Sequence, residues 1–170
     1  MFPETVIPTI AIIGRQNVGK STLYNRITKT RDALVADIPG LTRDPKIGLG
    51  KIGPIEYLVA DTGGIEQKKT GKNLIERVAK SAMEIANASE LILLVVDSRD
   101  GLTPSDREIL SEIRKLNKKI ILVANKSENI NHEFASAEFS ALGINNLYVI
   151  SAKENIGVQE LILEATQKWR

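Results

Sequence analysis

The sequence predicts an α/β fold: a mostly parallel six-stranded sheet with one antiparallel edge strand and helices on both faces. Three observations lead to this fold class. Short apolar runs alternate along the chain with segments of helical periodicity. Most of these runs are apolar without alternation, which is typical of strands covered on both faces. Polar motifs follow several of the runs directly, and in such sheets ligands bind beyond the carboxyl ends of the strands.

Six strands are expected from the apolar runs. They span residues 9–13, 46–52, 55–60, 91–96, 120–124 and 147–150. The run KIGLGKI at 46–52 is the edge candidate, because the Gly53-Pro54 turn would fold it back antiparallel onto IEYLVA at 55–60.

Five helices are expected between the strands. They span residues 20–28, about 72–87, 105–116, 132–141 and 157–168. Pro104 and Ser105 mark the start of the third helix. Trp169 is interpreted as a packing residue of the last helix, Asp97 and Asp100 as residues that shape a loop, and His132 is given no role.

Composition places limits on function. The 170 residues fit one domain, and 42% hydrophobic with 26% charged residues is ordinary for a globular protein. Without cysteine there is no disulfide or thiolate chemistry, which suits a reducing cytoplasm. No run approaches the roughly 20 apolar residues of a membrane span, and no signal peptide is evident. The net charge of +2 gives no indication of a basic patch that would bind RNA. The 4% of aromatic residues gives no indication of a surface that would stack on bases.

The strongest motif is GRQNVGKS at residues 14–21, between a predicted strand and a predicted helix. It matches G-x-x-x-x-G-K-[ST], whose backbone N–H groups surround a phosphate while the helix adds its N-terminal dipole. Lys20 would reach the β- and γ-phosphates, and the Ser21 hydroxyl would ligate Mg²⁺. A chance match is expected in well under about 1% of random chains of this length. The nucleotide-binding candidates here are Gly14, Arg15, Gln16, Asn17, Val18, Gly19, Lys20, Ser21 and Thr22.

Two further segments fit contacts to the metal and the γ-phosphate. In DTGG at 61–64, Asp61 would hold Mg²⁺ through water and Gly64 would offer its N–H to the γ-phosphate. In ADIPGLTRD at 36–44, Thr42 would ligate Mg²⁺ with its hydroxyl and contact the γ-phosphate with its N–H. Alone, each segment could be an ordinary turn.

NKSE at 125–128 resembles the guanine-reading NKxD motif of GTPases. There a carboxylate accepts from guanine N1–H and N2–H₂, the asparagine meets the ring edge, and the lysine stem lies along the base. Glu128 stands where aspartate is usual, so we expect guanine selectivity with weaker binding. SAK resembles the loop whose backbone N–H, here at Ala152, meets guanine O6. A polar loop that caps a helix is the alternative. The base-side candidates are Asn125, Lys126, Glu128, Ser151, Ala152 and Lys153.

The motifs occur in the order of a Ras-like P-loop GTPase fold. KTRDALVADIPGLTRD, with GRQNVGKST and DTGGI, resembles the first GTPase domain of the Der (EngA) family over essentially the whole chain. Era and the tRNA-modifying GTPase MnmE share the TRD segment, but the lead-in TKTRDALVAD and the early P-loop favour Der. Gln16 departs from that pattern, where proline is usual.

The resemblance implies a bacterial protein with two tandem G domains and a KH-like domain. Residues 1–170 are then one GTP-binding domain, the N-terminal part of a longer chain. It implies hydrolysis of GTP to GDP and phosphate, with Mg²⁺, and a role in large ribosomal subunit assembly. The implied partners are GTP, GDP and, through the full-length protein, the large ribosomal subunit or its rRNA. The location is cytoplasmic, without membrane contact, and the isolated domain is expected to be monomeric.

Ile65 raises a question about hydrolysis, because many GTPases carry a water-orienting glutamine directly after this DxxG turn. The resemblance suggests that K⁺ supplies positive charge, with Asn17 as a ligand. Arg43 is a rival as a built-in arginine finger, and Gln67 stands two residues late. The candidate catalytic residues are Asn17, Lys20, Thr42 and Gly64.

Two other functions compete with the GTPase hypothesis. One is a guanine-nucleotide binding module with little hydrolysis, in which Ile65 marks lost chemistry. The other is an ATPase or nucleotide kinase, which NKSE and SAK disfavour.

Overall fold

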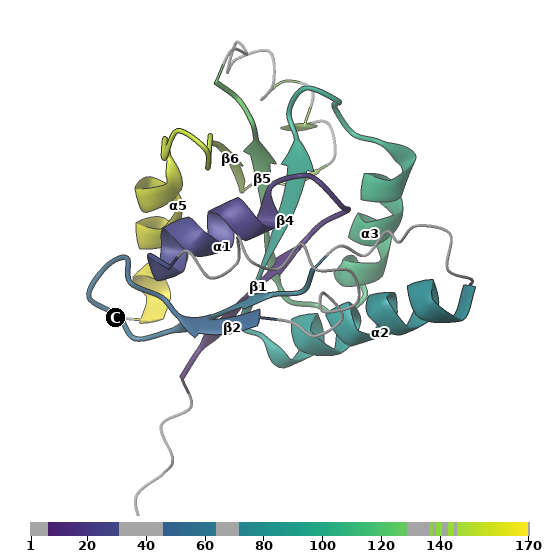
Figure 1. The fold of residues 1–170 in the computed structure, drawn as a ribbon, viewed down its shortest axis with the longest axis horizontal. Coiled ribbons are helices and arrows are strands. Elements are labelled where there is room, and N and C mark those ends of the chain that lie inside the picture. Colours follow the sequence, from purple (N-terminus) through teal and green to yellow (C-terminus); the bar gives the residue numbers. More distant parts are fainter. Residues whose placement is uncertain are drawn as a thin grey trace, which may run out of the picture.

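In a computed structural model, the chain forms a single sheet with helices packed against it (Figure 1). The structure describes residues 7–30, 46–63, 72–128, 137, 139–140, 143–144 and 146–169, and of residues 72–79 it describes only the backbone. The strands are β1 (Thr9–Ile13), β2 (Lys46–Leu49), β3 (Leu58–Asp61), β4 (Leu91–Asp97), β5 (Lys119–Asn125) and β6 (Leu147–Val149). The helices are α1 (Lys20–Thr28), α2 (Lys72–Ala88), α3 (Pro104–Arg114), α5 (Val158–Ala165) and the short 3-10 helix η2 (Gln167–Trp169).

The sheet has the order β2-β3-β1-β4-β5-β6 and is parallel except at one edge. There β2 pairs antiparallel with β3, with Lys46 opposite Asp61. The predicted fold class is therefore confirmed. β2 ends at Leu49, earlier than predicted, because Tyr57 crosses the turn and donates its hydroxyl to the carbonyl of Ile52 at 2.9 Å. One backbone hydrogen bond still follows β2, from the N–H of Gly50 to the carbonyl of Tyr57 at 2.9 Å. β3 begins at Leu58, later than predicted.

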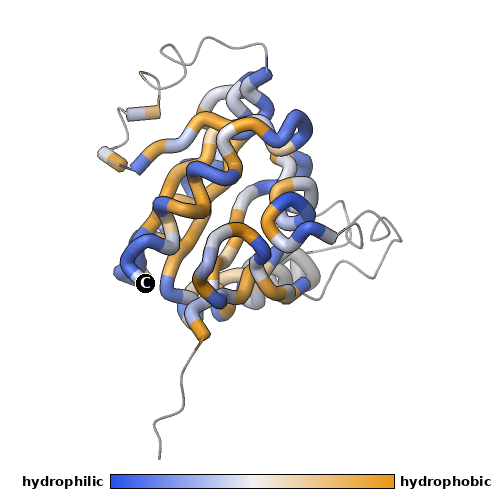
Figure 2. The backbone as a smooth tube through the Cα atoms, turned by 90° about the vertical axis from the view of Figure 1, so that its left-hand side faces the viewer, coloured by the Kyte–Doolittle hydropathy of each residue, from blue (hydrophilic) through white to orange (hydrophobic). Residues whose placement is uncertain are grey.

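Two hydrophobic cores lie on opposite faces of the sheet, because successive side chains of a strand point to opposite faces. Alternate residues of β4 divide between them: Leu91, Leu93 and Val95 join the core under α1 and α5. Ile92, Leu94 and Val96 join the core under α2 and α3. Figure 1 shows these two helix pairs on either side of the sheet, and Figure 2 shows long hydrophobic stretches of backbone running through the middle of the molecule. This explains why the central strands lack alternation in sequence.

The helices follow the prediction with adjusted ends. α3 begins at Pro104 after Thr103, which forms a capping box with Asp106. α5 ends at Ala165, earlier than predicted, where Thr166 Oγ1 donates back to the carbonyl of Ile162 at 2.9 Å. Trp169 packs against the first core, as predicted.

The predicted helix at 132–141 lies largely outside the described residues. Ala137, Phe139 and Ser140 are the described members, and each is helical. No helix among the described residues has the length and apolar character needed to cross a membrane.

Candidate nucleotide-binding site

The segment 14–19, called the P-loop from here on, joins the end of β1 to the start of α1. Asn17 and Gly19 have positive φ values of 69° and 100°, which turn the backbone tightly. A Cβ on Gly19 would lie 2.2 Å from Asn125 Nδ2, and one on Gly14 would lie 2.6 Å from the carbonyl oxygen of Val95. Larger side chains at these glycines would therefore collide with β4 and β5. The first turn of α1 carries no acidic residue and no side-chain cap, so its N–H groups suit an anion.

Lys20, the first residue of α1, is a buried cation directly after the P-loop, with 5% of its surface exposed. Its Nζ donates to the carbonyl of Arg15 at 2.8 Å. Burial lowers the pKa of Lys20 to about 8, although the charge of Asp61 opposes that shift. A phosphate beside this amine would favour its charged form, as the predicted role requires.

Ser21 and Asp61 meet at the start of α1 and the end of β3. Ser21 Oγ donates to Asp61 Oδ2 at 3.3 Å, while Asp61 Oδ1 accepts from the N–H of Gly63 at 3.0 Å. A hydroxyl and a carboxylate are the oxygen donors that Mg²⁺ takes when phosphates and waters complete its coordination. Within the described residues, no group of three or more His, Cys, Asp or Glu could hold a metal ion. The pair therefore fits a nucleotide-bound Mg²⁺ better than an all-protein metal cage.

Asn125 joins the P-loop to the predicted base-side loops. Its Nδ2 donates to the carbonyl of Val18 at 2.9 Å, and its Oδ1 accepts from the N–H of Ala152 at 2.9 Å. The side chain is buried, with 2% of its surface exposed. Because the Ala152 N–H already has an acceptor in Asn125, its predicted contact with a base oxygen stays a prediction.

Lys126 and Glu128 continue the same loop. Lys126 has a positive φ of 65°, and its Nζ donates to the carbonyl of Asn17 at 2.5 Å and lies 3.6 Å from Asp97 Oδ2. Glu128 accepts a short hydrogen bond from Ser151 Oγ, which also accepts from the N–H of Glu154. The two segments predicted to read the base are thus in direct contact.

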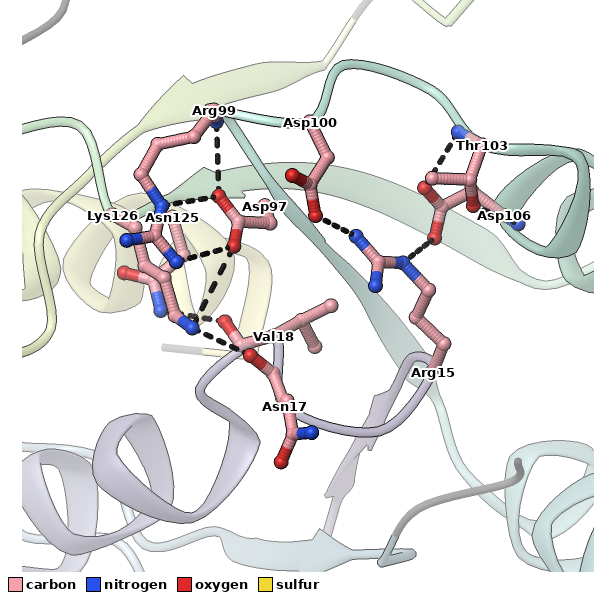
Figure 3. A network of polar contacts seen from close by, with 10 residues as sticks. All are labelled: Arg15, Asn17, Val18, Asp97, Arg99, Asp100, Thr103, Asp106, Asn125 and Lys126. Carbon is pink, nitrogen blue, oxygen red and sulfur yellow. Dashed lines mark hydrogen bonds and ion pairs between the residues drawn. The ribbon is translucent and has the colours of Figure 1, made fainter. Parts of the chain in front are cut away.

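Asp97 does more than shape its loop. Burial by itself would raise the pKa of Asp97, but hydrogen bonds from Arg99 and the charge of Lys126 hold that pKa below its usual value. Arg99 Nη2 lies 2.9 Å from Asp97 Oδ2. Asp97 is therefore a charged partner of the lysine that contacts the P-loop (Figure 3).

Sequence reasoning missed the contacts of Arg15. Figure 3 shows its guanidinium between two carboxylates, that of Asp100 in the loop between β4 and α3 and that of Asp106 in the first turn of α3. Arg15 Nη2 donates to Asp100 Oδ2 at 2.7 Å, and Nε lies 3.3 Å from Asp106 Oδ1. The Thr103 and Asp106 capping box was the available signal that an acid lies at the start of α3. Nothing local in the sequence indicated that Arg15 would reach it.

Arg26 was missed as well. From the second half of α1 it donates to the carbonyls of Ala152 and Lys153, at 2.8 and 2.7 Å. No motif marks this arginine, and its two acceptors are main-chain atoms distant in sequence.

The predicted residues that the structure describes gather at one end of the sheet. The P-loop, Ser21, Asp61, Asn125, Lys126, Glu128 and residues 151–153 follow the carboxyl ends of β1, β3, β5 and β6. Thr42, Gly64 and Ile65 lie outside the described residues, as do Arg43, Gln67 and His132. The roles expected of those residues stay predictions.

Comparison with known families agrees with this geometry. The sequence model of the family described as 50S ribosome-binding GTPase matches residues 9–126, which include the P-loop, Asp61 and Asn125. GTPase Der of Marinomonas sp. (strain MWYL1) is 47% identical over 157 residues, 92% of this chain and 35% of that protein. GTPase Der of Vibrio vulnificus (strain YJ016) is 46% identical over 160 residues, 94% of this chain and 32% of that protein. The chain spans about a third of the curated relatives it matches.

Solved structures are similar in fold. Era in complex with MgGDPNP and nucleotides 1506–1542 of 16S ribosomal RNA has a TM-score of 0.81 and 26% identity, covering 95% of this chain and 56% of that chain. Aquifex aeolicus Era bound to GDP·AlF₄⁻ has the same TM-score of 0.81 and 26% identity, covering 96% and 57%. The resemblance to Der and to Ras-like GTPases is thus confirmed. By its match over more than half of its length, the chain belongs to the family of 50S ribosome-binding GTPases.

Proposed function

We propose that residues 1–170 form one GTP-binding domain that binds Mg²⁺ and hydrolyses GTP to GDP and phosphate as a molecular switch. The observation that carries the proposal is the double hydrogen bond of Asn125. Its amide joins the P-loop carbonyl of Val18 to the N–H of Ala152. One buried side chain therefore fixes the phosphate-binding loop against both base-side segments, as recognition of a whole nucleotide requires.

The roles of the phosphate-side residues follow from their chemistry. Lys20 would bind the β- and γ-phosphates, and Gly64 would donate its N–H to the γ-phosphate. Ser21, Thr42 and, through water, Asp61 would hold Mg²⁺. When bound, Mg²⁺ neutralises charge on the phosphate oxygens. Ser21 and Asp61 are already in contact, so these two ligands need little rearrangement.

A potassium ion would supply positive charge beside the phosphates, in the place that Arg43 would take if it acted as an arginine finger. Asn17 is the proposed ligand. Its backbone is fixed in the left-handed region, and its carbonyl accepts from Lys126. In Figure 3 its side chain points away from the polar network, where it is exposed and free to reach a cation beside the phosphates.

The larger context rests on the relatives. We propose that this domain corresponds to the first G domain of a tandem-domain protein that acts in large ribosomal subunit assembly in the cytoplasm. The match to the family described as 50S ribosome-binding GTPase supports that context, and the similarity to GTPase Der over part of those proteins supports a longer chain. The Era structure was solved with ribosomal RNA, which supports an rRNA-containing partner. The isolated domain would be monomeric.

The second candidate is a guanine-nucleotide binding module with little hydrolysis of its own. Ile65 favours it, because an aliphatic side chain cannot orient the attacking water. In that case the domain would position another part of the protein according to the bound nucleotide.

GTP turnover with Mg²⁺, measured in KCl and in NaCl at matched ionic strength, tests both proposals. An excess in KCl that Asn17→Ala abolishes is expected for the potassium-dependent GTPase. Equal turnover in both salts would exclude the potassium role and favour Arg43. Negligible turnover with tight GDP binding would favour the binding module. Competition between GDP and ADP checks the base, since an ATPase would prefer ADP.

A further inference from the structure

Arg15 is the residue through which the P-loop contacts α3. Its Nη2 donates to Asp100 Oδ2 at 2.7 Å, and its Nε lies 3.3 Å from Asp106 Oδ1. Its main-chain carbonyl accepts from Lys20 Nζ at 2.8 Å. One residue therefore contacts both the lysine that is proposed to bind phosphate and the first turn of a helix that carries none of the nucleotide motifs.

Asp106 holds the start of α3 with the same carboxylate that faces Arg15 (Figure 3). Its Oδ2 accepts from the N–H of Thr103 at 3.0 Å, and its own N–H donates to Thr103 Oγ1 at 3.2 Å. This capping box satisfies N–H groups that the helix itself cannot bond. Because Asp106 is fully buried, the capping box also fixes how its second oxygen is presented to Arg15.

The contact between Arg15 and Asp106 is close, but it is not a full hydrogen bond. Arg15 Nε and Asp106 Oδ1 are both buried, and within the part of the chain that the structure describes neither atom has a hydrogen-bond partner. Their separation of 3.3 Å exceeds the roughly 2.9 Å that is usual for N–H···O bonds. A small approach of the P-loop to α3 would gain a charge-assisted bond. A retreat would leave a buried carboxylate without its cation.

We propose that Arg15 couples the P-loop to the capping box of α3, so that a nucleotide at the P-loop and the first turn of α3 stabilise each other. A ligand that orders the P-loop removes conformations in which Arg15 retreats from Asp106, and it thereby holds the capping box closed. The start of α3 is then sensitive to nucleotide, in addition to the segments predicted around Thr42 and Gly64. This inference rests on the proposed function, because it requires a nucleotide at the P-loop.

The coupling is reciprocal. If nucleotide stabilises the capping box by a given factor, an intact contact between Arg15 and Asp106 must raise the nucleotide affinity by the same factor. A purely structural ion pair behaves differently, because its contribution is equal in the free and the bound protein and cancels from the affinity. Amides in the first turn of a helix exchange by local opening, so a general stabilisation by ligand does not protect them.

Hydrogen exchange of backbone amides, resolved by NMR with and without saturating GDP, tests the first direction. The reporters are the N–H groups of Asp106 and Arg107, which donate to the hydroxyl and the carbonyl of Thr103. We expect GDP to slow their exchange about fivefold. The N–H groups of Lys115 and Asn117, which donate to carbonyls in the last turn of α3, are the internal control and should change less than about twofold.

Isothermal titration with GDP tests the reverse direction. Asp106→Asn keeps a side-chain acceptor for the capping box but removes the charge that faces Arg15. GDP affinity should therefore fall by the same factor, about fivefold, and GDP should no longer slow exchange of the Arg107 amide. Glu112→Gln removes an exposed carboxylate from the other end of α3, as a matched control, and should leave the affinity unchanged.

Equal slowing at both ends of α3, no slowing at either end, or an unchanged GDP affinity in Asp106→Asn would overturn the inference while leaving the proposed function intact. Failure of the unmodified chain to bind GDP would overturn both. If thermal unfolding shows that Asp106→Asn does not fold, Thr103→Ala and Thr103→Ser decide. Serine keeps the capping hydroxyl, so only the alanine variant should lose affinity, and equal affinities would reject the coupling.

Discussion

Two segments hold the P-loop from different sides, and they do so with different chemistry. The loop after β4 and the first turn of α3 hold Arg15 by charge, through Asp100 and Asp106. The end of β5 holds Val18 by a neutral amide, that of Asn125. The charged side combines an exposed carboxylate with a fully buried one, whereas the neutral side is buried throughout.

Because one side is neutral and the other is charged, the two sides should respond differently to ionic strength and pH. A neutral amide satisfies two buried main-chain groups without any net charge, so its contribution should not depend on ionic strength or pH. The charged side contains a buried ion pair, whose rupture leaves an uncompensated charge in the interior. The stability that the neutral side contributes therefore depends on shape, and the stability that the charged side contributes depends on charge balance. Four predictions test this contrast, from the largest expected effect to the smallest.

Arg15→Met should have the largest effect, because it leaves Asp106 buried without its cation. We expect the free energy of unfolding to fall by about 4 kcal/mol. Asp100→Asn removes the exposed partner and should cost less than about 1 kcal/mol. Urea denaturation of both variants measures the two losses. Equal losses would mean that the buried pair adds nothing to the charged side.

Lys20, directly after the P-loop, makes stability sensitive to pH in a way that the neutral side cannot. Its native pKa of about 8 lies below the ordinary 10.5, so between these values the unfolded chain binds more protons and stability rises with pH. The penalty for the buried charge is fully present below pH 8 and is removed as pH rises through 10.5. Relative to that of Lys20→Met, the free energy of unfolding of the unmodified chain should rise by about 3 kcal/mol between pH 7.5 and 10.5. Parallel pH dependence of the two chains in urea denaturation would refute this assignment.

Asn125→Ala tests the neutral side. The change leaves the carbonyl of Val18 and the N–H of Ala152 without their partner, at a cost of about 2 kcal/mol. The loss should be the same in 0.1 M and 1 M NaCl, because no charge is involved. Chemical denaturation at the two salt concentrations measures it. A loss that shrinks in high salt would contradict the contrast between the two sides.

Ser127→Ala should have the smallest effect. Its hydroxyl meets that of Ser98 at 2.6 Å and donates to the carbonyl of Ala124 at 3.1 Å, which links the ends of β4 and β5. We expect a loss of about 1 kcal/mol in unfolding free energy, with unchanged GDP affinity. A marked loss of affinity would show that this pair also shapes the base side.

Local sequence patterns were enough to locate the strands, because an apolar run and the turn residues beside it occupy consecutive positions. They also located the P-loop, because its glycines, lysine and serine follow one another. They failed for Arg15 and Arg26, whose partners lie 85 to 127 residues away. Such pairs become visible only when the sheet order brings β1, β4 and β6 into place. The end of β2 was also missed, because Tyr57 intervenes from across a turn.

Gly19 shows how closely the two halves of the site depend on each other. The space that a methyl group at this position would need is occupied by the amide of Asn125. A change in the phosphate loop would therefore displace the side chain that orders the base side. Among related sequences, we expect positions 19 and 125 to evolve as a pair: a bulkier residue at the first should appear only beside a smaller one at the second.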